Sequence, residues 1–256
     1  MNRFSCKSLL ASVTLLLVMA NSVTLKAAYF EGFDSVASIT ANNDPLKWAW
    51  FNKSQNAGAA ALDPSIGGWW QADASQSFNA QAGPASSFVR AGYDSAPLGV
   101  GNTYSNWYIT PTFDFVNGDT FSFYTRTFAN SPYPDRLQIR LSTSGTSNDV
   151  GNSYNTVGVF TNLLGDINSS EAVGGYPEAW TQFTYSVNSS FTGRIALRYY
   201  LPNSVNTANL IGVDSFSTTA NLYTPVPEPS TTILACISAG LLIWQRKKLY
   251  HKPSVA

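Results

Sequence analysis

The central part of this chain contains no histidine and no cysteine. The one histidine is His251 and the two cysteines are Cys6 and Cys236, so all three lie close to the ends of the 256-residue sequence. Residues 29–224 therefore cannot form a Ser-His-Asp or Cys-His triad or a typical zinc site. They also lack a Gly-rich phosphate loop. The chemistry that remains is carboxylate chemistry, either glycoside hydrolysis or calcium coordination.

Three carboxylates are candidates for a calcium site. Glu31 and Asp34 flank the first expected strand, and Asp214 lies in the last. The two chain ends commonly run close together in a jelly roll, so these side chains could converge on one ion if Asp34 lies beyond the strand end. Alternatively, they cap a strand and accept hydrogen bonds in turns. No spacing singles out a pair of carboxylates for glycoside hydrolysis, so we do not favour an enzyme.

Tryptophans are candidates for binding sugars. Trp48, Trp69 and Trp70 could stack on the apolar faces of sugar rings, while nearby Asn and Gln side chains bind hydroxyl groups. Neighbouring residues of a strand point to opposite faces, so we expect one of Trp69 and Trp70 in the core and the other exposed or under a loop. The alternative is that these aromatic residues fill the ends of a sandwich.

Arginines are candidates for binding an anionic glycan. Arg136 and Arg140 share one face of an expected strand, Arg194 and Arg198 share one face of another, and Arg126 lies on a third. If these strands are neighbours, the arginines form a basic stripe that could contact anionic polysaccharide. The alternative is a solvated sheet face whose charges are balanced by acidic residues on neighbouring strands.

The elements that position these residues are predicted to be strands. Short alternating stretches dominate residues 29–220, turn signals separate them, and helical periodicity is absent. We expect strands at 29–33, 87–91, 106–110, 120–125, 136–141, 156–160, 182–187, 194–199 and 210–217. The long polar segments 41–81 and 145–177 are expected to be loops. This pattern predicts one all-β domain over residues 29–220, a jelly-roll-like antiparallel β-sandwich.

The charge balance excludes one class of partner. Residues 29–224 contain eight Lys and Arg and fourteen Asp and Glu, a net charge of −6. Phosphate binding needs a basic face, so we expect no nucleic acid as a partner.

Both ends of the chain carry signals for export. Residues 1–28 are predicted to be a signal peptide with a signal helix, because basic Arg3 and Lys7 precede an apolar run and small residues. Residues 221–230 are expected to be a linker, 231–244 a short transmembrane helix and 245–256 a basic cytoplasmic tail. Such a helix spans about 21 Å, less than the ~30 Å of a hydrocarbon core, which favours transient insertion and processing. The alternative is a small permanent anchor.

The tail resembles the PEP-CTERM sorting signal of bacterial surface proteins. Pro227, Glu228 and Pro229 form the motif within V-P-E-P-S-T, and a basic cluster follows the apolar run at Arg246, Lys247 and Lys248. The resemblance implies that an exosortase-type membrane enzyme recognises the tail during export.

The body is similar to the choice-of-anchor J domain, which is related to cleaved-adhesin and MAM-like jelly rolls. The similarity rests on the order of short motifs at 30–34, 106–111, 135–143, 180, 193–200 and 211–214. It implies that acidic positions like Glu31, Asp34 and Asp214 bind calcium in relatives. Related families often end with Asp-Asp, whereas this chain has Asp214-Ser215.

These features predict an exported protein of the cell surface or extracellular matrix, membrane-anchored transiently or permanently by the C-terminal helix. We expect a non-catalytic adhesive or structural role in an exopolysaccharide-rich envelope. The expected partners are an exosortase-type enzyme and exopolysaccharide, and the expected cofactor is calcium. A carbohydrate-binding module and a carboxylate-dependent glycoside hydrolase are the alternatives.

Overall fold

The computed structural model describes residues 29–35, 44–97, 101–203 and 208–225. The predicted signal peptide lies outside these ranges, as do the predicted transmembrane helix and the sorting-signal residues Pro227, Glu228, Pro229, Arg246, Lys247 and Lys248. Within the described ranges, no helix combines the length and the apolar character needed to cross a membrane.

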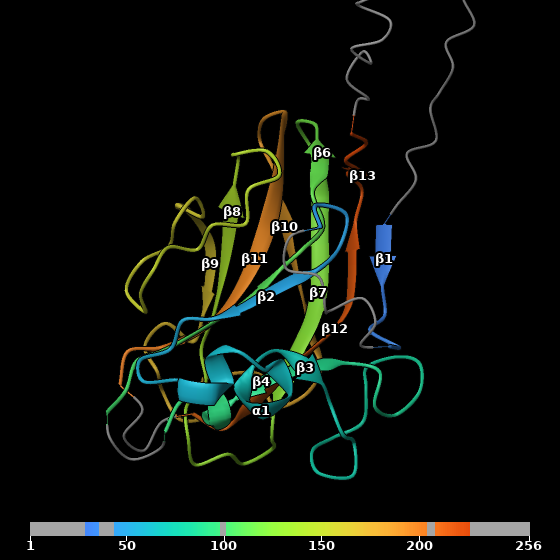
Figure 1. The fold of residues 1–256 in the computed structure, drawn as a ribbon. Coiled ribbons are helices and arrows are strands. Elements are labelled where there is room, and N and C mark those ends of the chain that lie inside the picture. The colour runs from blue at the N-terminus through green and yellow to red at the C-terminus, as the bar shows by residue number, and fades with distance from the viewer. Residues whose placement is uncertain (1–28, 36–43, 98–100, 204–207, 226–256) are drawn as a thin grey trace, which may run out of the picture.

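Two antiparallel sheets pack face to face and form the predicted jelly-roll-like sandwich (Figure 1). The six-stranded sheet has the order β10–β7–β12–β4–β3, and β1 also pairs with β12. Its strands are β1 (Tyr29–Glu31), β3 (Trp70–Gln71), β4 (Val89–Gly92), β7 (Thr120–Thr127), β10 (Thr181–Ser186) and β12 (Leu210–Thr218).

The seven-stranded sheet is built around its longest strand, β11. One edge of β11 pairs with β5 and β6, and the other pairs with β8, which in turn pairs with β9. β2 lies beyond β5, and β13 lies beyond β6. The strands are β2 (Ala49–Asn52), β5 (Tyr104–Ile109), β6 (Phe113–Phe115), β8 (Leu137–Ser142), β9 (Asn162–Ile167), β11 (Phe191–Leu201) and β13 (Asn221–Leu222).

The main core lies between the two sheets, where the alternation of the strands places it. Leu137, Ile139 and Leu141 of β8 point inward, as predicted, and meet inward-facing Phe121 and Phe123 of β7 within one cluster of buried residues. Aromatic rings fill one end of this core. Trp48, Tyr108 and Trp69 form a stack, with ring centroids 4.5 Å apart for Trp48 and Tyr108 and 5.5 Å apart for Tyr108 and Trp69.

A second core lies on the outer face of the seven-stranded sheet, and it corrects one predicted strand. Residues 156–160 are not a strand; the strand in this region is β9, at Asn162–Ile167. Val150 and Phe160 instead lie buried against Trp107 and Ala196. We name residues 143–161 the covering segment. Its apolar residues alternate because they pack onto the sheet, not because they pair in a ladder.

The remaining differences lie in the long polar segments and at the end of the domain. Segment 41–81 contains strands β2 and β3 and two short helical turns, η2 (Gly58–Ala61) and α1 (Pro64–Gly67). A third turn, η3 (Tyr93–Ser95), follows β4. The sandwich continues past residue 220, because β13 pairs with β6 and the Tyr223 backbone N–H donates to the Thr112 carbonyl oxygen at 2.9 Å. The predicted linker therefore starts too early.

Candidate functional site

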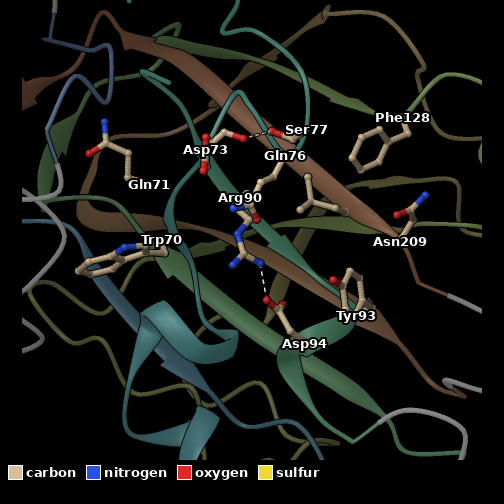
Figure 2. A pocket seen from close by; sticks show the side chains of 11 residues that line it. Trp70, Gln71, Asp73, Gln76, Ser77, Arg90, Tyr93, Asp94, Phe128 and Asn209 are labelled. Atoms are coloured by element: carbon tan, nitrogen blue, oxygen red, sulfur yellow. Dashed lines mark hydrogen bonds and ion pairs between the residues drawn. The ribbon is translucent and has the colours of Figure 1, made fainter. Parts of the chain in front are cut away.

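The outer face of the six-stranded sheet carries an open cleft. Val89 and Ala91 of β4 point into the core, so Arg90 between them points outward. Trp69 is buried, and the next residue, Trp70, is partly exposed and pairs with Arg90 across β3 and β4. The two outward side chains begin a cleft of about 500 Å³, shown in Figure 2. Its lining residues are Trp70, Gln71, Asp73, Gln76, Ser77, Arg90, Tyr93, Asp94, Phe128, Asn209 and Leu210.

Two aromatic side chains stand on opposite sides of Arg90 in this cleft (Figure 2). One is Trp70, and the other is Tyr93, which is 45% exposed at the start of η3. The Tyr93 backbone N–H donates to the carbonyl oxygen of Asn209 at 2.8 Å, which fixes η3 against the start of β12. The cleft therefore presents two aromatic surfaces, and its backbone is hydrogen-bonded to the sheet.

The polar centre of the cleft is an ion pair. Nη1 of Arg90 donates to Oδ2 of Asp94, and both side chains are about one-fifth exposed. Oδ1 of Asp94 is buried and has no hydrogen-bond donor among the described residues. Asp73, at the rim, accepts hydrogen bonds from the side-chain hydroxyl and the backbone N–H of Ser75, which lower the pKa of Asp73. The lining thus holds one basic and two acidic groups among several amides.

One wall of the cleft belongs to a long loop between β3 and β4, residues 72–88, which we name the wall loop. Oδ2 of Asp214 accepts the backbone N–H groups of Gln81 (2.7 Å) and Ala82 (3.2 Å), and Oδ1 accepts that of Ser215 (2.6 Å). Ser215 has φ +52° where the register of β12 shifts, and this irregularity aims the Asp214 carboxylate at the loop. Burial raises the pKa of Asp214. Asp214 therefore holds the wall loop onto the sheet.

The predicted calcium ligands do not fit a calcium site in this arrangement. Oε1 of Glu31 accepts the Phe33 backbone N–H at 2.8 Å, and both oxygens of Asp214 already accept backbone N–H groups. Asp34 is exposed. No group of three acidic, histidine or cysteine side chains among the described residues could hold an ion. Calcium binding stays a prediction, which a rise in the melting temperature of chelator-treated protein in millimolar calcium would support.

The structure places one of the three tryptophans of the predicted sugar site in the cleft, and sugar binding there stays a prediction. Trp69 is buried and Trp70 partly exposed, as strand alternation predicts. Trp48 and Trp69 are 1% and 0% exposed, and their indole N–H groups donate to Tyr29 Oη and to the Asn106 carbonyl oxygen. Neither of these two rings can stack on a ligand, which corrects the prediction for both. They belong to the main core, and Trp70 alone of the three lines the cleft.

The predicted basic stripe is wrong for Arg194 and Arg198. β8 and β11 are neighbours, as the prediction requires, but the two arginines are only 1% and 2% exposed. Arg194 donates to the carbonyl oxygens of Thr110 (2.7 Å) and Lys47 (2.9 Å). Arg198 donates to the Tyr154 carbonyl oxygen at 2.5 Å, and its guanidinium lies 4.6 Å from the centroid of the Trp107 ring. Burial lowers the pKa of Arg194 to about 10 and of Arg198 to about 9.

The other two arginines of the stripe are also engaged within the protein. Arg136 forms ion pairs with Asp166 (2.7 Å) and Glu171 (2.9 Å), which raise its pKa. Arg140 donates to Gln138 Oε1 and to the carbonyl oxygen of Phe160, in the covering segment. A stripe open to anionic polysaccharide is therefore absent from this face.

The sequence contains no pattern that predicts several of the cleft residues. Arg90 lies on a predicted strand, and its spacing of four residues from Asp94 allows an ion pair, but that spacing is common. Tyr93, Gln76 and Asn209 are neighbours only because the wall loop, η3 and the start of β12 meet. Only the pairing of the strands brings Trp70 next to Arg90.

Comparison with known proteins finds similar folds only. No family model and no curated protein sequence matches the chain. Among solved structures, the K1 cleaved-adhesin domain of Lys-gingipain from Porphyromonas gingivalis W83 is similar over 76% of this chain and 99% of its own, with 21% identity and a TM-score of 0.45. The K3 domain of the same protein is similar over 75% and 98%, with 16% identity and a TM-score of 0.45.

A carbohydrate-binding module of family 11 from Clostridium thermocellum is also similar. The match covers 77% of this chain and 98% of the module, with 11% identity and a TM-score of 0.37. At these identities and TM-scores, the similarities assign no ligand to this chain, so its function has to be argued from the cleft.

Proposed function

We propose that this chain is an exported, non-catalytic protein of the cell surface or extracellular matrix that binds glycan in the cleft of the six-stranded sheet. The observation that carries the proposal is the pair of partly exposed rings, Trp70 and Tyr93, on either side of the Arg90–Asp94 ion pair. A membrane-embedded exosortase-type enzyme, as the tail motif implies, remains the proposed processing partner.

The cleft lining suits the chemistry of sugars. A sugar ring has an apolar face of C–H groups, which packs on an aromatic plane, and an edge of hydroxyl groups, which need donors and acceptors. Trp70 and Tyr93 supply the planes, and Gln76 and Asn209 supply amide groups in the lining. The shape is an open cleft rather than an enclosed pocket, which suits a segment of a polymer.

The carboxylates of the cleft are poorly arranged for hydrolysis. A glycosidase needs one carboxyl group with a raised pKa as the acid and a second carboxylate as the base or nucleophile. Asp73 has a lowered pKa, and Asp94 is bound to Arg90. The glycoside hydrolase alternative predicts release of reducing ends from a bound polysaccharide, and we expect none.

Glycan retention tests the proposal. On a glycan array and in affinity electrophoresis, Tyr93→Ala and Trp70→Ala should each weaken binding roughly tenfold, as expected for loss of about 1–2 kcal/mol from an aromatic contact. Tyr133→Ala is the matched control, because Tyr133 is also 45% exposed but lies outside the cleft lining. Wild-type protein with no saturable glycan binding would instead support a purely structural matrix role.

A further inference from the structure

Arg126 lies on the same outer face as the cleft, beyond its Phe128 end. The strand registers place Trp70, Arg90, Gly212 and Arg126 opposite one another on β3, β4, β12 and β7. Phe128, which lines the cleft, is two residues from Arg126, so both side chains leave the sheet on the same face. The row that starts in the cleft therefore reaches Arg126 across Gly212, whose outer face is covered by the rings of Phe78, Phe88 and Trp180.

The guanidinium of Arg126 is held in place by neutral groups. Nε donates to the carbonyl oxygen of Thr127 at 3.1 Å, and Nη2 donates to that of Glu178 at 2.6 Å. The guanidinium carbon lies 4.5 Å from the centroid of the Phe78 ring. Phe78 comes from the wall loop and contacts Phe128 edge-on, with 5.5 Å between ring centroids. Aromatic rings thus connect the end of the cleft to Arg126.

The positive charge of Arg126 is not neutralised by the protein. Within the described part of the chain, Arg126 forms no ion pair, whereas Arg90 and Arg136 each bind a carboxylate. Arg194 and Arg198 also lack such a partner, but both are buried, and Arg140 lies against the covering segment. Arg126 is partly exposed on the open face. Its Nη1 group has no acceptor among the described residues, and so it can donate to a ligand.

The charges along the row specify where an acidic group of a ligand would sit. Asp73 and Asp94 make the cleft unfavourable for an anion, while Arg126 makes the far end favourable. Two strand spacings separate β4 from β7, so Arg126 lies about 10 Å from Arg90 along the row. One sugar ring cannot reach both places, but linked sugars can.

We propose that Arg126 is a subsite for the carboxylate of an acidic polysaccharide whose neighbouring neutral sugars occupy the cleft. This inference rests on the proposed binding of glycan by the cleft. A guanidinium binds a carboxylate with a charge-assisted hydrogen bond, and the contacts to Thr127, Glu178 and Phe78 orient Arg126 before the ligand arrives.

Three polysaccharides in which uronate alternates with neutral sugars, xanthan, gellan and hyaluronan, each with its carboxyl-reduced form, test this subsite. For at least one pair, we expect wild-type protein to bind the acidic form roughly tenfold more tightly, as for loss of one charged hydrogen bond. Arg126→Gln should bind both forms alike, Arg126→Lys should keep part of the preference, and Arg140→Gln should behave as wild type. Trp70→Ala should weaken binding of both forms. Urea unfolding of each variant checks that it is folded.

The outcomes separate this inference from the proposed function. Equal binding of the acidic and reduced forms by wild-type protein, with loss of both in Trp70→Ala, would overturn the Arg126 subsite and keep the cleft. An acid preference that survives in Arg126→Gln would also overturn it. Absence of binding to all six polymers would overturn the proposed function, and the subsite with it.

Discussion

The two outer faces of the sandwich differ in what covers them, although both carry arginines on their strands. On the seven-stranded sheet, the covering segment lies over the face, buries Trp107 and supplies the Tyr154 carbonyl oxygen to Arg198. On the six-stranded sheet, the wall loop covers only part of the face and leaves Arg90 and Trp70 lining an open cleft. The same side-chain chemistry therefore stabilises the fold on one face and is available to a ligand on the other.

This difference shows that the role of an arginine depends mainly on the loop that covers its strand. Its position on the strand matters less. Arg198 interacts with two aromatic rings and three neutral oxygens, from Ser105, Gln138 and Tyr154, without any carboxylate. Arg90 has a carboxylate partner and partial contact with solvent. A buried arginine acts as a multiple hydrogen-bond donor that holds a loop, whereas an exposed one keeps donors for a partner.

The largest expected effect is a difference in the free energy of unfolding between variants on the two faces. Trp107→Ala should lower the free energy of unfolding by about 4 kcal/mol, because it empties the second core and leaves Phe160 without its neighbour. Trp70→Ala, the control on the open face, should cost about half as much, roughly 2 kcal/mol, because part of its ring stays in contact with solvent. Urea unfolding measures both. Similar losses in the two variants would contradict the distinction between the faces.

Replacing an arginine on each face should have a smaller effect on the free energy of unfolding. Arg198→Gln should cost about 3 kcal/mol, since it removes a buried hydrogen-bond donor from Tyr154 and its contact with Trp107. Arg90→Gln should cost less than about 1 kcal/mol, as expected for a partly exposed ion pair. The covering segment should also become more sensitive to proteases in the Arg198 variant only. Equal sensitivity in both variants would argue that Arg198 does not hold the covering segment on the sheet.

The smallest effect concerns a carboxylate that joins the two sheets near the cleft. Asp135 accepts hydrogen bonds from Thr127 of one sheet and Tyr199 of the other, both at 2.6 Å, and from the backbone N–H of Asn209 at the cleft. Burial raises its pKa, so folding favours the neutral acid. The stabilisation of the folded protein by protonation of Asp135 is complete below the unfolded pKa of about 4. It is lost as the pH rises through the pKa of Asp135 in the folded protein.

Asp135→Asn tests the direction of this pH dependence because asparagine does not titrate. The stability of wild-type protein relative to the variant should therefore increase as pH falls from 8 towards 4.5, as measured by urea unfolding at several pH values. An advantage of wild-type protein that shrinks on acidification would show that Asp135 is buried as the carboxylate.

The sequence was sufficient for the sandwich but only partly for the cleft. Alternation at 136–141 and 194–199 identifies the inward side chains, because one face of each strand must be apolar. The same rule places Trp69 and Trp70 on opposite faces. It could not reveal that the covering segment buries Arg194 and Arg198, because a loop that packs on a sheet has no fixed period. The meeting of Trp70, Arg90 and Tyr93 likewise depends on strand pairing and loop folding.

Strand β12 connects the cleft to the ends of the domain, and this has a mechanical consequence. Leu210 at its start lines the cleft, while Thr218 at its end pairs with Tyr29, and Figure 1 shows β1 and β13 at the end away from β3 and β4. The strand spans roughly 26 Å. If the chain is tethered beyond β13 while the cleft holds a polymer, tension runs along β12. Its hydrogen bonds to β4, β7 and β1 are then loaded in shear and must break together, so the domain should resist pulling far better than strands peeled apart one bond at a time.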